Sequence, residues 1–525
     1  MITQQAKRVS GVVTDSAGEP IPGANVVQKE TTNGTVTDMN GKYTLDVPNN
    51  ATLVISFIGY TTKEIKVGSQ SVLNVSLVEE AIGLNEVVAI GYGYVKKKDL
   101  TGAVSTVSAD DMVLGGTVSN AAQALQGKTA GVQVSQSSKA PGGTIAVRVR
   151  GNNSISSTNE PLYVVDGFPS SEGLNLNPND IESMQILKDA SATAIYGARA
   201  ANGVIVITTK NGRAGKPQIT FSTKLSYSPK FDIDRLNLLT SDEKVNLELD
   251  LLQSDYTYRE NKGEVARIIS RYGLTNAYKN GGWSALSTQA QNEITNLRSI
   301  NTDWNDILFR GTFNQEYNVS LSGGSEKATY YTSLGYYDEK GNVKGVEADR
   351  LNMVLKTSYK VNKMLKVGAS LFANRRTNKS NLTDSDGFSN PVYYSRRANP
   401  YQTPFDEDGN YVYDIDIQGK GDSDLKFNVF EERNNTSYEQ TTNALSAIFD
   451  VELRFNDKFK ATSQVGLQLD AVSKESIADH DTYAMRKDKE RTTMSSLNNQ
   501  SFLPDGGKHT ETASSNSQVN WKSQA

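Results

Sequence analysis

The chain has 525 residues, enough for roughly three or four domains of average size. Charged residues make up 22% and aromatic residues 8%, a composition typical of folded rather than disordered protein. The formal net charge of -4 provides no broad cationic surface for a phosphate backbone, which argues against nucleic acid as a partner. Cysteine is absent, so disulfides, thiolate metal sites and cysteine nucleophiles are excluded.

The remaining residues offer little for catalysis. The two histidines, His480 and His509, lie far apart in polar segments, and we interpret both as ordinary loop residues. Asp38 and Asp406 begin segments that resemble calcium loops, but the twelfth position, where a loop of that kind needs glutamate, is asparagine or isoleucine. We therefore predict that the chain is not an enzyme and has no catalytic residues, no metal site and no cofactor.

Two glycine-containing segments resemble nucleotide-binding motifs and are rejected. Gly91 and Gly93 begin a dinucleotide fingerprint, but Lys96 replaces its third glycine. Residues 127–129, Gly-Lys-Thr, resemble the end of a phosphate-binding loop, but Ala122 stands where the first glycine is required.

From the N-terminus, residues 8–77 alternate short strand-like runs with turn residues, a pattern that predicts a small β-sandwich. Residues 79–98 interrupt this rhythm with one apolar run framed by charges and glycines, and we interpret them as a tether carrying one unpaired strand. Residues 99–212 combine strand-like runs with two short helix-like segments, 119–127 and 191–200. They predict a mixed α/β domain.

After residue 218 the alternation becomes long and regular, as in the runs 219–227, 351–361, 445–455 and 459–469. Runs of ten or more residues exceed the usual strand length of about five or six. They fit tilted strands that cross a bilayer with one apolar face and one wet face. A large soluble sandwich or propeller is the alternative. Between the runs lie short turns and three long polar loops, 229–312, 375–441 and 471–512.

Several long motifs then resemble one family in the correct order. Residues 9–48 resemble a carboxypeptidase-regulatory-like domain. A TonB box and the entry to a plug domain are resembled by the segment LNEVVAIGYGYVKKKDLTG. The plug domain itself is resembled by four segments, NAAQALQGKTAGVQV, RVRGNNSI, PLYVVDGFP and LNPNDIESMQILKD. The chain is thereby identified as similar to SusC/RagA-type TonB-dependent outer-membrane transporters of Bacteroidetes. The predicted fold is mainly β, and the predicted domains are a β-sandwich (1–80), a TonB-box tether (81–98), an α/β plug (99–216) and part of a transmembrane antiparallel β-barrel (217–525).

The resemblance implies import of large nutrients, oligosaccharides or peptides, across the bacterial outer membrane, with the N-terminal domain and the TonB box in the periplasm. The implied partners are TonB with its ExbB-ExbD energising complex, a SusD-like surface lipoprotein acting as a lid, the substrate and outer-membrane lipid. A sensor that signals the presence of substrate is the alternative, and a surface adhesin or enzyme-associated module is a third.

Three groups of residues are assigned roles. The TonB-box strand, by its position in the family, is expected to pair with TonB by β-augmentation. Plug charges could seat the plug on lumen-facing wall charges such as Glu452 and Arg454, and a tyrosine-rich loop could contact substrate. The residues are Glu86, Val87, Val88, Ala89 and Ile90 for coupling; Arg148, Arg150, Glu182, Lys188 and Asp189 for seating; and Tyr393, Tyr394, Tyr401, Tyr411 and Tyr413 for substrate.

The sequence departs from the family in two respects. It shows no signal peptide, and about eight membrane-type strands are predicted after the plug, where the complete barrels have about 22. An eight-stranded barrel is filled by its own side chains and cannot enclose a plug. We therefore expect the chain to be the N-terminal part of a longer transporter.

Overall fold

A computed structural model gives the arrangement of the chain, which forms two compact units, residues 1–88 with 93–101, and residues 89–92 with 102–525. The structure describes residues 7–524 except 16–17, 30, 32, 58–59, 69, 79–86, 91–92, 97–103, 110–119, 137, 139, 144, 152–158, 171–175, 190–192, 232–235, 255–262, 383–386, 415, 418–424, 457–458, 495–499 and 502–504.

The first unit is the predicted β-sandwich. Its two sheets have the strand orders β4-β1-β7 and β3-β2-β5-β6. Strand β4 alternates strictly between exposed and buried residues, and its Tyr43, Leu45 and Val47 enter a core shared by both sheets. The strands are β1 (Lys7–Thr14), β2 (Asn25–Gln28), β3 (Gly34–Val36), β4 (Lys42–Val47), β5 (Thr52–Ser56), β6 (Lys63–Lys66) and β7 (Val75–Ser76).

The tether differs from its prediction. Residues Val87–Ile90 form a strand, β8, as expected, but β8 pairs with β9 (Gly93–Lys96) in a separate two-stranded sheet. A hairpin therefore replaces the single unpaired strand. Two strands of four residues share few backbone hydrogen bonds, and an isolated two-stranded hairpin is at best marginally stable in water.

The plug contains a five-stranded sheet of order β10-β15-β16-β13-β14 and a separate hairpin, β11-β12. Its two expected helices are only 3-10 turns, η2 (Gln123–Leu125) and η5 (Ala194–Ala200); Gly197, with φ of 64°, interrupts η5. The strands are β10 (Val104–Ser108), β11 (Val132–Gln136), β12 (Ile145–Val149), β13 (Leu162–Val165), β14 (Phe168–Ser170), β15 (Ile181–Leu187) and β16 (Val204–Thr209).

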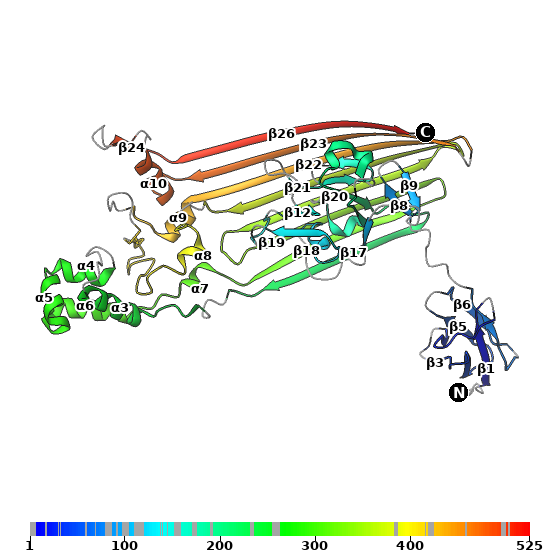
Figure 1. Cartoon of the computed structure of the whole chain (residues 1–525), viewed down its shortest axis with the longest axis horizontal. Helices are drawn as coiled ribbons and strands as arrows, with labels where there is room; N and C mark the ends of the chain where they lie inside the picture. The colour runs from blue at the N-terminus through cyan, green and yellow to red at the C-terminus, as the bar shows by residue number, and fades with distance from the viewer. Residues whose placement is uncertain are drawn as a thin grey trace. The chain divides into compact units, whose positions relative to one another are not determined.

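The predicted long strands form one antiparallel sheet of eight, in chain order, and the plug lies against it (Figure 1). The strands are β17 (Gly215–Ser228), β18 (Thr312–Gly324), β19 (Ala328–Lys340), β20 (Glu347–Lys360), β21 (Leu365–Ser380), β22 (Thr436–Arg454), β23 (Lys460–Ala478) and β26 (Lys508–Gln524). At 13 to 19 residues they are longer than usual strands, and the alternation that predicted them separates two different faces.

One face of the sheet is apolar and exposed. Ile219 and Phe221 of β17 are 75% and 66% exposed, and Leu445, Phe449, Leu467 and Trp521 also point away from the plug. The opposite face carries polar residues and contacts the plug. Such a surface is unusual for a water-soluble protein, which rarely exposes a continuous apolar patch of this extent.

The sheet has two unlike ends. Short turns such as 325–327 and 361–364 join strands at one end, and long insertions emerge at the other. The first insertion, predicted as a polar loop, is helical, and small apolar cores fill it and the second one. The helices are α3 (Ser241–Gln253), α4 (Glu264–Arg271), α5 (Thr275–Gly281), η7 (Gly282–Ala285), α6 (Thr288–Ser299), α7 (Trp304–Leu308), α8 (Pro391–Tyr394), α9 (Val429–Asn435) and α10 (Tyr483–Thr492), with short strands β24 (Thr493–Met494) and β25 (Gln500–Ser501).

The described helices are all too short or too polar to cross a membrane.

Candidate functional site between the plug and the sheet

The first contact between the plug and the sheet is made by a tight turn. Val165 of β13 pairs with Phe168 of β14, so only Asp166 and Gly167 connect the two strands. Both have positive φ, 48° and 85°, as a type I′ hairpin turn requires. Aspartate and glycine are favoured in this turn because they tolerate the left-handed region. The motif VVDGF therefore sets the position of the Asp166 carboxylate.

Asp166 connects the plug to two strands of the eight-stranded sheet, which is called the wall below. Its Oδ1 accepts a hydrogen bond from the backbone N–H of Thr209 (2.9 Å), and its Oδ2 accepts bonds from the Thr209 hydroxyl (2.6 Å) and from Lys356 Nζ on β20 (2.9 Å). Gln464 on β23 donates to the Asp166 carbonyl oxygen (3.2 Å). The side chains of Lys356 and Asp166 are only 9% and 16% exposed, so the ion pair is largely shielded from water.

A second contact lies at the start of β15. Asn177 accepts a hydrogen bond from the backbone N–H of Asn179 and caps the turn η4 (Pro178–Asp180), with Pro178 in the first helical position. Asn179 Nδ2 donates to Glu316 Oε1 on β18 (2.7 Å), and Tyr331 on β19 donates its hydroxyl proton to Asp180 Oδ1 (2.8 Å). The motif LNPND, already part of the family resemblance, thus carries two wall contacts.

The second contact is buried more deeply than the first. Asp180 is 1% exposed, and burial raises the pKa of its carboxyl above the usual range, although the Tyr331 hydrogen bond acts in the opposite direction. On the wall, Lys224 Nζ lies 3.5 Å from Glu316 Oε2, so a cation accompanies the buried glutamate. Buried polar groups of this kind are costly to leave unpaired, which makes the position of the plug specific.

Apolar packing completes the contact. Tyr331, Lys356, Ile448 and Gly466 lie in one row of cross-strand partners, and Tyr331 and Ile448 belong to the main apolar core of the plug. The Phe168 ring sits over Gly466, where an added Cβ would lie only 2.0 Å from the ring. The absence of a side chain at position 466 therefore makes room for Phe168.

The predicted seating residues lie elsewhere. Arg150 pairs with Asp189, Arg213 with Glu182 (3.3 Å), and Lys188 donates to Ser105 and to the Ala130 carbonyl, all inside the plug. Arg148 lies on β12, half-buried. On the wall, Arg454 pairs with Glu452 of the same strand (3.1 Å). A seating role for these residues stays a prediction; the contacts described above come from Asp166, Asn179 and Asp180, which sequence reasoning missed.

The coupling residues are described only in part. Val87, Val88, Ala89 and Ile90 make up strand β8, whereas Glu86 lies outside the described residues. Their role in coupling stays a prediction.

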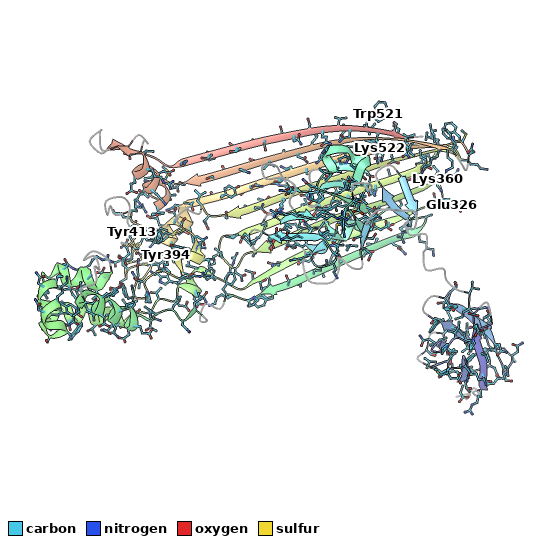
Figure 2. The ribbon with its side chains drawn as sticks, in the orientation of Figure 1. Glu326, Lys360, Tyr394, Tyr413, Trp521 and Lys522 are labelled. Atoms are coloured by element: carbon cyan, nitrogen blue, oxygen red, sulfur yellow. The ribbon has the colours of Figure 1, made fainter. Side chains whose placement is uncertain are left out.

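The tyrosine-rich loop lies at the end of the sheet that carries the long insertions, as Tyr394 and Tyr413 show, far from Glu326 and Lys360 at the other end (Figure 2). Tyr394 and Tyr401 are buried, and their hydroxyls donate to Asp414 and Glu248. Tyr413 donates to Glu431, Tyr411 packs on Phe405, and Arg397 lies 4.4 Å above the Tyr393 ring. These contacts give the tyrosines a part in loop packing. Tyr393, Tyr411 and Tyr413 keep some exposed surface, so substrate contact remains a prediction for them.

No group of three or more metal-ligating side chains occurs within the part of the chain that the structure describes.

Comparison with known proteins places these domains. The family described as CarboxypepD_reg-like domain matches residues 9–89, and the TonB-dependent Receptor Plug Domain matches residues 96–204. TonB-dependent receptor SusC of Bacteroides thetaiotaomicron is 40% identical over 346 residues, which cover 64% of this chain and 30% of SusC. TonB-dependent receptor P26 of Formosa agariphila is 38% identical over 418 residues, which cover 77% of this chain and 37% of P26.

Among solved structures, the RagAB peptide importer in the 'open-open' state matches with a TM-score of 0.58 at 26% identity, over 75% of this chain and 43% of that chain. The chain spans about a third of the length of the curated relatives it matches. These relatives are receptors rather than enzymes, and the eight-stranded sheet matches part of a TonB-dependent barrel. In its two matched domains, its relatives and its fold, the chain is similar to part of the TonB-dependent receptors of the SusC/RagA type.

Proposed function

We propose that this chain takes part in TonB-dependent import of large nutrients, oligosaccharides or peptides, through the bacterial outer membrane. One observation supports this most directly: a folded plug is held by buried polar contacts on the inner face of a sheet whose outer face is apolar and exposed. A plug that is held by specific, limited contacts can close a pore and still be released by force.

The shape of the apolar surface supports insertion in a bilayer. In the direction of the long insertions, the last large apolar residue that points outward is Phe313 in β18, Leu351 in β20, Leu445 in β22 and Val519 in β26. The cross-strand register places each of these residues closer to the short turns than the one before. A border that drifts in one direction is what tilted strands in a flat membrane produce.

Coupling to the inner membrane would begin at β8. We propose that β8 leaves its partner β9 and adds to the sheet of TonB, energised by ExbB-ExbD, through backbone hydrogen bonds. Each such bond contributes about 1 kcal/mol. Pairing with another strand is favoured when the existing pairing is weak, and the β8-β9 hairpin has only four residues a side.

The remaining partners follow from the relatives. SusC and the RagAB peptide importer lead us to propose a SusD-like lipoprotein lid over the long insertions and a periplasmic location for the β-sandwich. RagAB is a peptide importer, and the name of SusC specifies no cargo, so the substrate class stays open between oligosaccharide and peptide.

A proline substitution tests the coupling step in the full protein. Val88→Pro removes a backbone donor from β8 and should abolish growth on the imported nutrient while surface abundance stays unchanged. The matched control, Val88→Thr, keeps both the donor and the β-branched side chain and should transport normally. Normal uptake by the proline variant would exclude this role for β8.

A further inference from the structure

The outward face of the sheet carries one isolated charge. Five consecutive outward rows run across the described strands, from the row of Tyr359 and Val367 to the row of Tyr336 and Leu351. In these rows Arg375 on β21 is the only charged side chain, and all others are apolar, aromatic, hydroxyl or amide residues. A charge on a lipid-facing surface is costly unless something pairs with it.

Among the described residues no carboxylate forms a close ion pair with Arg375, and Asp349 interacts with it only at longer range. The direct cross-strand neighbours of Arg375 are Leu351 and Asn443, and the nearest acidic residue on the outward face, Asp349, lies one row farther toward the long insertions. Within the described residues its guanidinium makes no ion pair within 4 Å, whereas Lys379, four residues farther along β21, pairs with Glu439 at 3.3 Å. Arg375 is exposed, and a guanidinium carries five N–H donors.

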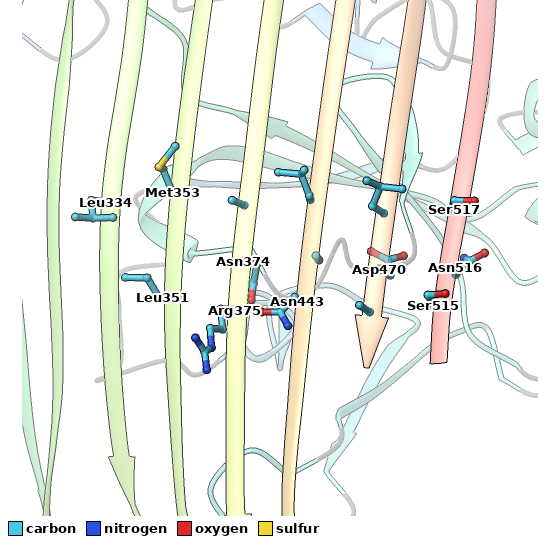
Figure 3. A pocket seen from close by; sticks show the side chains of 15 residues that line it. Leu334, Leu351, Met353, Asn374, Arg375, Asn443, Asp470, Ser515, Asn516 and Ser517 are labelled. Carbon is cyan, nitrogen blue, oxygen red and sulfur yellow. The ribbon is translucent and has the colours of Figure 1, made fainter. Parts of the chain in front are cut away.

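Next to Arg375 the sheet forms an apolar groove of about 580 Å³. Its large apolar side chains come from Leu334, Leu351, Met353, Leu445 and Leu469, and the small residues Ala373 and Ala471 line it between them. Figure 3 shows Leu334, Leu351 and Met353 on one side of Arg375 and Asn443, with Asp470, which also lines the groove, on the other side. Arg375 and Asn443 lie at its polar end, toward the long insertions.

The depth of this group in the membrane follows from the two neighbouring strands. On β20 the last large apolar residue that points outward, Leu351, is the direct partner of Arg375, and on β22 the last one, Leu445, lies one row nearer the short turns. Long insertions distinguish the outer side of such sheets from the side with short turns. Arg375 therefore lies at the outer headgroup level, with the groove extending into the apolar layer.

We propose that the groove binds one anionic lipid of the outer leaflet, with an acyl chain between Leu351, Ala373 and Leu445 and a headgroup phosphate on Arg375, assisted by Asn443. The planar guanidinium is well suited to phosphate, which it binds with two parallel hydrogen bonds. This inference rests on the proposed function, because it requires the sheet to lie in the outer membrane.

Binding to purified protein in neutral detergent tests the site. The full chain is titrated with phosphorylated lipid A, with a diacylglycerol of the same chain length, which has no phosphate, and with inorganic phosphate, and retained lipid is counted by native mass spectrometry. Arg375→Gln should weaken lipid A binding about tenfold, the effect of one charge-assisted bond, and leave diacylglycerol binding unchanged. Ala471→Leu should weaken both lipids because it fills the groove, and the control Lys379→Gln should change neither.

Three outcomes would overturn the proposal. They are equal lipid A binding by Arg375→Gln and the unsubstituted protein, inorganic phosphate binding as tightly as lipid A, and Arg375-dependent association of two copies in place of lipid retention. Fractionation of cells separates this failure from that of the proposed function. A chain absent from the outer membrane would refute the proposed function, whereas a chain present there without Arg375-dependent lipid binding refutes only the groove.

Discussion

The plug and the long insertions are both attached to the eight-stranded sheet, but in different ways. The insertions are continuous with the strands, as where α9 ends at Asn435 and β22 begins at Thr436, and a core around Trp304, Tyr394 and Phe427 fills them. The plug meets the wall through a few side chains, and its central polar contact, Asp166 with Lys356, joins residues 190 positions apart. Docking of the plug should therefore depend on a few side-chain contacts, whereas the insertions are held by their own apolar core and by the strands that continue from them.

Of the substitutions considered, loss of Lys356 should weaken the attachment of the plug most, with little effect on the insertions. Lys356→Met leaves the largely shielded Asp166 carboxylate without its cation. Breaking a fully buried pair in this way costs about 3 to 5 kcal/mol, and we expect a smaller cost here because Thr209 still donates two hydrogen bonds to Asp166. We expect faster hydrogen exchange and proteolysis in the plug, with unchanged exchange in the insertions. Adding Asp166→Asn should restore much of the protection. If the plug of Lys356→Met alone exchanges hydrogen and is cleaved as slowly as that of the unsubstituted protein, the ion pair does not hold the plug.

Filling the space at Gly466 should have the next largest effect. Gly466→Leu places a side chain where the Phe168 ring lies, and overpacking of this kind costs about 1 to 3 kcal/mol. Hydrogen exchange of β13 and β14 should accelerate. Leu467→Ala, on the neighbouring outward position, is the control and should leave the plug protected. Equal effects of the two substitutions would mean that the sheet, rather than plug docking, had changed.

The stability of the long insertions should depend on pH. Burial of Glu432, which accepts hydrogen bonds from the backbone N–H groups of Tyr483 and Ala484, raises its pKa to about 7 from 4.5. Between these values the folded insertion holds a proton that the unfolded one releases, so stability is present at low pH and falls as the pH rises toward 7. Protection of the amides of α10 should therefore be lower at pH 8 than at pH 5.

A matched variant identifies the group responsible. Glu432→Gln cannot titrate, so it should reduce the difference between the two pH values, leaving the part that comes from Asp414, whose burial raises its pKa to about 6. An unchanged pH dependence in that variant would assign the effect to other groups.

The smallest expected effect is local to α3. The Thr240 side chain accepts from the Glu243 backbone, and the Glu243 side chain accepts from Thr240, so the two form a capping box. Thr240→Ala should destabilise the helical insertion by about 1 kcal/mol, measured by hydrogen exchange of α3, and leave the plug unaffected. A change in the plug would show that the two regions are coupled.

Short-range sequence patterns predicted much of this fold. Contacts between residues far apart in the sequence could not be predicted from such patterns. Two-residue alternation predicted the long strands, because one face of each is apolar. The Asp-Gly pair at 166–167 and the Thr-x-x-Glu spacing at 240–243 are sequence signals of a turn and of a helix start, which were not used in the prediction. The helices α3 and α6 were missed because their polar composition gives weak apolar periodicity. The segments 119–127 and 191–200 were predicted helical from composition, but glycines and short length reduce them to 3-10 turns.

Only the plug residues of the candidate site could be recognised in the sequence, and their partners on the sheet could not. VVDGF and LNPND were part of the family resemblance, but their partners Lys356, Tyr331 and Glu316 look like ordinary inward residues of an alternating strand. Pairing them requires the register of several strands and the orientation of the plug, neither of which short-range patterns encode.

The shared row of Tyr331, Lys356 and Gly466 has a consequence for assembly. A slip of one residue in any of these strands would turn its member of the row to the exposed apolar face. Asp166, Asp180 and Phe168 can meet their partners only when β19, β20 and β23 are all correctly aligned. The plug can therefore dock only on a correctly registered sheet, and a misaligned strand would leave polar groups of the plug without their partners.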